Sequence, residues 1–248
     1  MTHALETRNL SKRFGSLVAT NDVSLSVAKG ARHALIGPNG AGKTTLINLL
    51  TGVLTPSSGQ ILLEGEDITA TPAHHRVGRG LSRTFQINQL FADFTPLEAL
   101  MLAIGEREGQ GSMAWKPLSK NHAIIDEAAS LLDRFRLTDA LSTPTKLLPY
   151  GKQRLLEIAL AIAARPRVLL LDEPAAGVPE EERHEVLGIV RALPADVTVV
   201  LIEHDMDLVF SFADRISVLV AGGLFKEGTV EEISHDPQVK AIYLGEDA

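Results

Sequence analysis

The chain of 248 residues contains no cysteine, which excludes disulfide bonds and thiolate metal sites. Long apolar runs are also missing. The longest are segments such as residues 197–202, far short of the roughly 18 residues that span a bilayer. The first residues, MTHALE, lack the basic start and the apolar stretch of a secretory signal peptide. We therefore expect a cytoplasmic protein.

Basic residues are outnumbered: 24 Lys and Arg stand against 31 Asp and Glu, which gives a net charge of −7. This balance disfavours binding to nucleic acid or to anionic lipid. We expect no nucleic-acid partner, and we expect another protein to hold the chain at any membrane that it meets. The length suffices for one large α/β domain or two small ones.

The segment GPNGAGKT, residues 37–44, matches the P-loop pattern GxxxxGK[ST]. Residues 32–36 before it read as a short buried strand, and residues 45–50 after it continue as a helix. Glycines let the backbone curl so that successive N–H groups face a phosphate, and the helix N-terminus adds its dipole. The alternative, a glycine-rich turn that binds nothing, is disfavoured by this strand and helix context.

The pattern predicts a site for the phosphates of a nucleotide. Lys43 can reach the β and γ phosphates, and the Thr44 hydroxyl can ligate Mg²⁺. The expected nucleotide-binding residues of this loop are Gly37, Pro38, Asn39, Gly40, Ala41, Gly42, Lys43, Thr44 and Thr45.

Around this loop the apolar pattern changes period along the chain. Residues 5–27 alternate between apolar and polar side chains and are interrupted by turn signals, which predicts antiparallel strands. Residues 60–64 add another strand to this group. From about residue 95 to 164 the period is helical. An exposed insertion rich in Gly and charge is expected at 105–120, where Trp115 is read as a local anchor rather than a ligand platform.

Residues 168–171 and 197–201 are continuous apolar runs, as expected of parallel strands that are buried on both faces. A helical stripe lies between them, so this unit is strand–helix–strand. A hairpin around residues 221–223 and two short helical stretches close the chain. We predict an α/β fold: a P-loop NTPase core with a mostly parallel sheet, an N-terminal antiparallel β subdomain and an inserted α-helical subdomain.

The segment VLLLDEP, residues 168–174, ends an apolar strand in two adjacent carboxylates at the sheet edge where α/β folds bind ligands. In P-loop enzymes an acid at this place holds Mg²⁺, often through water, and Asp172 fits that role. Glu173, on the opposite side of the extended chain, could orient the water that attacks the γ-phosphate. An ordinary acidic strand end is the alternative.

A third polar group follows the next core strand, in the segment VLIEHD. His204 stands at the same ligand edge, where its imidazole could donate to the γ-phosphate and sense hydrolysis. Most lone histidines are structural or surface residues. The position of His204 after a strand parallel to that of Asp172 favours a functional role.

These three features in this order, together with an internal helical subdomain, resemble the ATP-binding subunit of ABC transporters over nearly the whole chain. The resemblance implies ATP and Mg²⁺ as cofactors. It also implies one ABC-type nucleotide-binding domain over residues 1–248, with a helical subdomain at about 87–164 and a C-terminal tail at about 226–248.

Two further site residues follow from the resemblance. Phe14 is similar to the aromatic residue that stacks on adenine, although it could equally belong to the core. Gln86, in the segment RTFQ, is similar to the glutamine that senses the γ-phosphate and helps to organise Mg²⁺. A simple surface glutamine is the alternative for Gln86.

The family signature LSGGQ is represented by LPYGK, residues 148–152, so Tyr150, Gly151 and Lys152 would contact the ATP of a partner subunit from a helix N-terminus. The chain departs from the pattern here. Pro149 replaces the serine whose hydroxyl would donate to the γ-phosphate. Pro179 stands in a following loop that lacks the usual aspartate of the dimer contact. Both departures concern communication across the dimer rather than ATP binding.

Several details are similar to Liv-type ATPases, which serve importers of branched-chain amino acids: the segments RTFQ, DEPAAG, EHDM and IYLGE. The resemblance implies a dimer, homo- or heteromeric, that sandwiches two ATP molecules. It further implies transmembrane permease partners, an indirect partner in a periplasmic or extracellular solute-binding protein, and a place at the inner face of the membrane. The resemblance also implies two sets of site residues. The catalytic residues would be Lys43, Gln86, Glu173 and His204, and the residues that organise Mg²⁺ would be Thr44, Gln86 and Asp172.

Residues 87–97, with Phe91 and Phe94, are the expected docking surface for the permease, although core packing also explains these aromatics. The ATPases of urea uptake and of lipopolysaccharide export share these motifs with the Liv-type ATPases, so the motifs leave the identity of the transported solute open. A soluble ATPase acting on nucleic acid or ribosomes is disfavoured by the acidic balance and the absence of a basic arm. A subunit that binds but does not hydrolyse ATP is disfavoured by the presence of four residues: Lys43, Asp172, Glu173 and His204.

Overall fold

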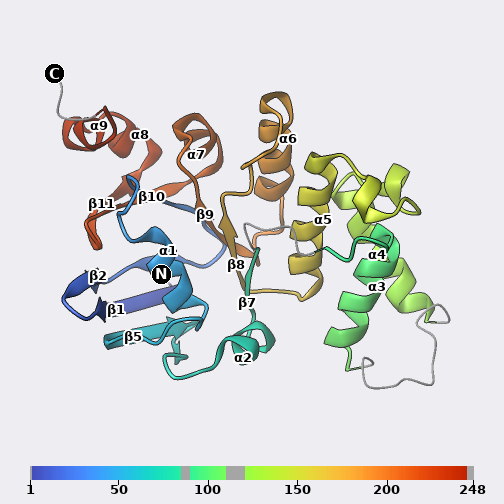
Figure 1. The fold of residues 1–248 in the computed structure, drawn as a ribbon, viewed down its shortest axis with the longest axis horizontal. Coiled ribbons are helices and arrows are strands. Elements are labelled where there is room, and N and C mark those ends of the chain that lie inside the picture. Colours follow the sequence, from blue (N-terminus) through green and yellow to red (C-terminus); the bar gives the residue numbers. More distant parts are fainter. Residues whose placement is uncertain (1, 85–89, 110–120, 245–248) are drawn as a thin grey trace. The chain divides into compact units, whose positions relative to one another are not determined.

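The computed structural model describes residues 2–84, 90–109 and 121–244, which form two compact units. The sheet unit consists of Met1–Arg83, Arg167–Glu173 and Leu193–Ala248. The helical unit consists of Thr84–Pro166 and Pro174–Ala192. Figure 1 follows the chain through both. None of the helices within the described ranges is long and apolar enough to cross a membrane.

The sheet unit begins with an antiparallel sheet, as the alternating N-terminal pattern predicts. Its strand order is β2-β1-β5-β6, and β3 pairs with β1 at the side. Every recorded pairing in this sheet is antiparallel. The strands are β1 (His3–Phe14), β2 (Leu17–Val23), β3 (Ser26–Ala28), β5 (Ser58–Leu63) and β6 (Glu66–Asp67).

The second sheet of this unit has the order β11-β10-β4-β9-β8-β7 and is parallel except for the antiparallel β11. Every residue of β4, β8 and β9 is buried. Burial on both faces is why residues 168–171 and 197–201 are continuous apolar runs in the sequence, whereas β4 begins with the buried polar residues Arg32 and His33. The predicted, mostly parallel sheet is confirmed. Its strands are β4 (Arg32–Ile36), β7 (Leu81–Arg83), β8 (Val168–Asp172), β9 (Thr198–Ile202), β10 (Arg215–Val220) and β11 (Gly223–Thr229).

Helix α1 (Lys43–Leu50) joins the two sheets into one core, because its buried Leu46, Ile47, Leu49 and Leu50 cluster with apolar side chains of both. The C-terminal end of α1 is closed by the guanidinium group of Arg76, which donates to Leu49 O and Leu50 O, the latter at 2.5 Å. Terminal carbonyls without intrahelical partners need such donors. The other helices of this unit are α2 (Ala73–Gly78), α7 (Met206–Phe212), α8 (Val230–Ser234) and α9 (Pro237–Leu244).

In the helical unit, α3 (Pro96–Arg107) packs against α4 (His122–Arg134) and α5 (Tyr150–Ala163), and α5 contacts α6 (Glu180–Arg191). Helix α3 starts with a capping box, in which the side chains of Thr95 and Glu98 accept each other's backbone N–H. Two short 3₁₀ turns, η2 (Thr138–Ala140) and η3 (Thr145–Leu147), lead into α5.

The expected insertion at 105–120 begins too early. Helix α3 continues to Arg107, and Gly105 is buried in it. Arg107 explains why the helix does not end sooner: its guanidinium donates to both carboxylate oxygens of Glu127, at 2.7 and 2.8 Å, and to Ala163 O at 2.7 Å. Trp115 lies outside the described residues.

Candidate nucleotide-binding site

The predicted P-loop connects β4 to α1, in the middle of the sheet unit (Figure 1). Its glycines adopt positive φ angles, 156° at Gly37 and 96° at Gly42, which other residues rarely accept. Their surroundings also exclude a side chain. A Cβ on Gly37 would lie 2.2 Å from Leu219 O, and one on Gly42 would lie 2.5 Å from Ala19 O. The glycines are therefore required by the packing of the loop as well as by its curvature.

A cavity of about 520 Å³ opens over this loop, within the range of about 300–1,000 Å³ typical of small-ligand sites. Four pieces of the sheet unit line it: the start of β2, the P-loop, Glu173 and the turn between β10 and β11. The P-loop and Glu173 are predicted site residues. Five further lining residues were not predicted, because they carry no reactive group and reach the cavity only through the fold: Leu17, Val18, Ala19, Ala221 and Gly222.

Lys43 is folded back into the P-loop. Its Nζ donates to Gly37 O at 2.6 Å and to Pro38 O at 3.1 Å, so the loop carbonyls hold the ammonium beside the cavity. Burial lowers the pKa of Lys43, and the negative charges of Glu173 and Asp172 oppose this shift. A loop that concentrates backbone N–H groups and one lysine fits the triphosphate of a nucleotide.

Glu173 and His204 come together at the carboxyl ends of β8 and β9, as predicted. His204 Nδ1 lies 3.7 Å from Glu173 Oε1 and also 3.7 Å from Oε2 of Glu203, a carboxylate whose side chain is only 2% exposed. No role for Glu203 follows from the sequence, although an acid directly after an apolar strand was a signal for one. The three side chains form a polar group at the sheet edge beside the P-loop cavity.

The predicted backbone conformation of Glu173 was wrong. We expected it to continue the extended strand, but β8 ends at Asp172, and Glu173 has a φ of 47° in the left-handed region. Its N–H still bonds Ile202 O at 2.9 Å, which ties the turn to β9. Such a conformation costs about 1–3 kcal/mol and persists where the surrounding structure demands it, often at functional sites. The turn brings the Glu173 carboxylate to the cavity.

Asp172 is buried, and its Oδ2 accepts a hydrogen bond of 2.7 Å from the guanidinium of Arg83. The described residues hold no cluster of three or more His, Asp or Glu side chains that could bind a metal by themselves. Mg²⁺ usually takes one or two protein ligands and completes its shell with phosphates and water. Asp172 and the hydroxyl of Thr44 suit such a shared site, and a protein-only cage is excluded within the described ranges.

Phe14 is not a core residue. It ends β1 with 46% of its surface exposed, and the Nζ of Lys12 lies 5.1 Å from its ring centroid. In the hairpin it lies opposite Leu17, which lines the cavity, although Phe14 itself does not. The position is compatible with stacking on a base at the rim of the site. Gln86 lies outside the described residues.

The signature segment begins α5 in the helical unit. Pro149 is its N-cap and makes no side-chain capping hydrogen bond. The expected loss of a hydroxyl donor to the γ-phosphate stays a prediction. Tyr150 is 41% exposed and covers Gly177, where a Cβ would lie 3.0 Å from its ring. Lys152 forms an ion pair with Asp139.

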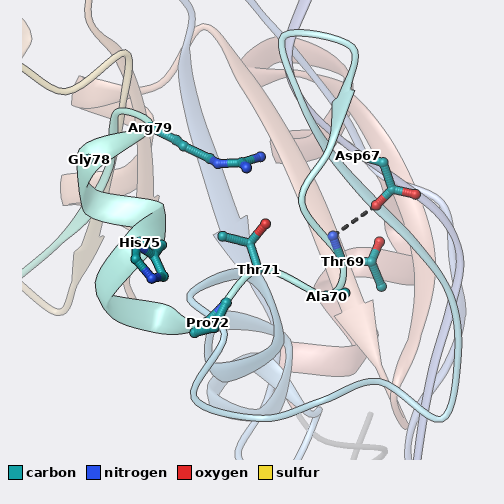
Figure 2. A pocket seen from close by; sticks show the side chains of 8 residues that line it. All are labelled: Asp67, Thr69, Ala70, Thr71, Pro72, His75, Gly78 and Arg79. Atoms are coloured by element: carbon teal, nitrogen blue, oxygen red, sulfur yellow. Dashed lines mark hydrogen bonds between the residues drawn. The ribbon is translucent and has the colours of Figure 1, made fainter.

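A second hollow, of about 780 Å³, is formed by the segment from Asp67 to Arg79 of the sheet unit. Figure 2 shows His75 and Arg79 on its α2 side, and Asp67 and Thr69 across from them. Asp67 Oδ1 accepts the Thr69 N–H at 2.8 Å, and Arg79 pairs with Glu66 at 2.6 Å. Asp67 and Arg79 thus have partners within this part of the chain, and none of the residues that line the hollow is a predicted nucleotide contact.

Comparison with known proteins agrees with this geometry. Residues 20–176 match the family ABC transporter, and residues 227–248 match the family Branched-chain amino acid ATP-binding cassette transporter. The chain is 41% identical over 251 residues to the high-affinity branched-chain amino acid transport ATP-binding protein BraF of Pseudomonas aeruginosa, covering 98% of both chains. It is 39% identical over 249 residues to the corresponding protein LivG of Escherichia coli K12, again covering 98% of both.

Among solved structures, the ADP conformation of the ATP-binding cassette MJ1267 superposes with a TM-score of 0.87 at 33% identity, covering 99% of this chain and all of that one. The fold, the P-loop cavity and two full-length relatives lead to the same result. The chain belongs to the ABC transporter family, in the group of ATP-binding proteins that contains BraF and LivG.

Proposed function

We propose that this chain is the ATP-hydrolysing subunit that powers uptake of branched-chain amino acids across the cytoplasmic membrane. The observation that carries the hydrolytic part is the cavity that brings together Lys43 of the P-loop and Glu173, the residue directly after β8. The cargo is supported by the names of BraF and LivG and by the match of residues 227–248 to the branched-chain family.

Each residue of the cavity has a physical reason for its proposed role. The glycine-shaped P-loop binds the phosphates through backbone N–H groups, and Lys43 adds a cation beside them. Mg²⁺ bound with ATP would neutralise charge on the phosphates, held by Thr44, Asp172 and Gln86. Glu173 would orient the attacking water and accept its proton, and His204 would donate to the γ-phosphate; their separation of 3.7 Å supports action on one nucleotide.

The permease subunits would dock on the helical unit. Phe91 and Phe94 lie 5.1 Å apart between ring centroids, and their side chains are 59% and 37% exposed. The Thr145 N–H and hydroxyl both donate to Phe94 O, at 2.8 and 2.7 Å, which brings the 66% exposed Leu147 close to this segment. Exposure of all three side chains supports a contact surface over the alternative of core packing.

The working unit would be a dimer in which the start of α5 faces the ATP of the partner subunit. Tyr150, Gly151 and Lys152 are the proposed contacts there. The N-cap Pro149 provides no hydroxyl to the γ-phosphate. The proposed donor is instead the Gly151 N–H, because N–H groups in the first turn of a helix have no intrahelical partner. Loss of one donor makes a mixed dimer with unequal sites a consistent alternative to a pair of identical chains.

Uptake assays test the cargo. Cells that lack this chain should lose high-affinity uptake of labelled leucine, isoleucine and valine, and the wild-type chain should restore it. The Glu173→Gln variant should be produced at the same level without restoring uptake. Labelled urea serves as the matched alternative solute.

Isolation of the tagged subunit from native membranes completes the test. We expect two permease proteins, and a solute-binding protein that binds branched-chain amino acids, to accompany it. The mass of the intact assembly then distinguishes one kind of ATPase subunit from two. Restored urea uptake with unchanged leucine uptake would contradict the proposed cargo, and association with lipopolysaccharide-export components would do the same.

A further inference from the structure

Arg83 connects three elements of the nucleotide site through one guanidinium group. It is the last residue of β7, which runs parallel to β8 so that Arg83 lies opposite Leu170. Its NH2 group donates to Asp172 Oδ2 at 2.7 Å, and its NH1 group donates to Asn48 Oδ1 at 2.8 Å. Asn48 belongs to α1, which begins at Lys43. One side chain therefore joins β7, β8 and the helix that follows the P-loop.

The pair of Arg83 and Asp172 is shielded from water, with side chains that are 11% and 4% exposed. A carboxylate so deeply buried is stable in its charged form only when a cation or several donors face it. The planar guanidinium presents donors in a fixed fork and can hold two oxygen acceptors at once. A lysine ammonium, a point charge on a flexible stem, holds two such acceptors less firmly.

We propose that Arg83 is a positioning residue for the ATPase reaction, one that presets the orientation of the Asp172 carboxylate toward Mg²⁺. The inference rests on the proposed role of Asp172. The bond to Oδ2 fixes the rotation of the carboxylate, so the directions of both oxygens are set before a metal arrives. The bond to Asn48 fixes the carboxylate relative to α1, on which Thr44 stands. The spacing between the two proposed magnesium ligands is thereby held.

An ion pair with only a structural role would affect different measured quantities than a positioning residue does. It would contribute to the melting temperature, and its loss would leave the magnesium dependence of the folded protein unchanged. A positioning residue affects the additional affinity that Mg²⁺ confers on nucleotide binding, because only that quantity depends on the direction of the Asp172 oxygens. The ratio of the ATP dissociation constants in EDTA and in excess Mg²⁺ measures it, and we call this ratio the magnesium increment.

The test uses the purified full-length chain, a fluorescent ATP analogue and thermal melting. In Arg83→Met the magnesium increment should fall about 10- to 100-fold, the usual loss when a residue that orients a metal ligand is removed, while affinity in EDTA stays at the wild-type value. Arg83→Lys, which keeps the charge, should show a smaller loss. Arg79→Met removes an exposed arginine paired with Glu66 and should keep the full increment.

A double-mutant cycle isolates the partnership. Asp172→Asn should itself lower the magnesium increment, and adding Arg83→Met to it should change the increment no further, because the two substitutions remove one function. Independent, additive losses would overturn the inference. The Mg²⁺ concentration for half-maximal turnover should rise in parallel in Arg83→Met.

A wild-type magnesium increment in folded Arg83→Met would overturn the inference directly. If that variant does not fold, Arg83→Lys and Asn48→Ala decide, since each leaves a buried cation beside Asp172; wild-type increments in both would overturn it. A wild-type protein whose nucleotide affinity ignores Mg²⁺ would overturn the proposed role of Asp172 as well. The failure of the inference alone is therefore distinguishable from the failure of the proposed function.

Discussion

The Nδ1 atom of His204 lies 3.7 Å from Oε1 of Glu173. The two residues follow neighbouring parallel strands, and the N–H of Glu173 bonds Ile202 O at the end of β9. The distance is longer than a hydrogen bond, so neither side chain holds the other in place. His204 is 66% exposed and Glu173 is 29% exposed, so both can reach a ligand at the sheet edge. This geometry suits a general base and a phosphate-sensing imidazole that act on one nucleotide.

Replacement of Glu173 by Gln should separate binding from hydrolysis. The variant should bind MgATP like the wild type, and its turnover should fall about 100-fold or more, because an amide cannot accept the proton of the attacking water. Steady-state phosphate release measures turnover, and calorimetry measures binding. We also expect the variant to accumulate as a closed dimer with MgATP, visible as a shift in size-exclusion chromatography.

Glu66→Gln is the matched control, since Glu66 has a 63% exposed side chain and pairs with Arg79 rather than with the site. Its turnover should equal that of the wild type. Equal turnover in Glu173→Gln and wild type would remove Glu173 from the role of base.

Gly42→Ala should abolish tight nucleotide binding. At a φ of 96° a Cβ is strained, and this one would also lie 2.5 Å from Ala19 O, a backbone atom that cannot move by itself. The loop must shift, and the N-terminus of α1 shifts with it. Calorimetry with MgATP should show the loss, and thermal melting should show a decrease of stability of about 1–3 kcal/mol.

Gly188→Ala tests the same reasoning with the opposite sign. Gly188 lies in helix α6, is exposed and has open space where a Cβ would lie. Alanine there should stabilise the protein by about 0.5–1 kcal/mol, because glycine loses more backbone freedom in a helix. Full nucleotide affinity in Gly42→Ala would contradict the packing argument for the loop.

Phe14→Ala should weaken ATP binding without destabilising the fold, because Phe14 is 46% exposed and therefore contributes little to the core. Loss of one stacking contact with a base costs about 1–3 kcal/mol, or roughly 5- to 150-fold in affinity. Inorganic tripolyphosphate has no base, so its affinity should be the same in both proteins. A lower melting temperature together with unchanged ATP affinity would assign Phe14 to packing instead.

His33 should make the protein less stable in mild acid. The side chain is buried in β4, its Nε2 lies 2.8 Å from Ser217 Oγ, and burial lowers its pKa to about 4. The nearby Glu227 carboxylate opposes this shift, and Arg215 adds to it. The unfolded chain, with a histidine pKa of about 6.5, takes up the proton first as the pH falls. Stability from the neutral His33 is therefore complete above pH 6.5 and is lost between about pH 6.5 and 4.

Chemical denaturation at pH 7.5 and pH 5 measures the effect. Wild type should lose about 2 kcal/mol more than His33→Gln over this interval, because glutamine can bond Ser217 but does not titrate. His122→Gln, at the start of α4, is the control for replacing a histidine by glutamine. Parallel pH curves for wild type and His33→Gln would contradict the assignment.

Local sequence patterns predicted most of the elements, because their causes are local. The N-terminal alternation, the buried runs of β4, β8 and β9 and the helical stripes of α3, α4 and α5 were all confirmed. The boundary at Gly105 was wrong, because a bond between Arg107 and the distant Glu127 keeps the helix regular. The sequence pattern around Gly105 could not predict that contact, because Glu127 lies on another helix.

In the candidate site, too, some residues could be recognised from the local sequence and others only from the fold. The P-loop glycines, Lys43, Asp172 and Glu173 are recognisable because the backbone curvature and the chemistry belong to a few consecutive residues. Arg83 is different. It stands 89 positions from Asp172, and only the adjacency of β7 and β8 makes it the partner of that carboxylate.

From its residues alone the chain could be assigned a nucleotide chemistry, because phosphate binding needs a contiguous run of small residues and one cation. Tertiary structure decided which apolar residues surround the cavity, why Glu173 leaves the extended conformation, and which cation compensates Asp172. The physical reason is the range of the forces involved: backbone curvature is set within a few bonds, whereas burial and charge pairing depend on which strands the fold makes neighbours.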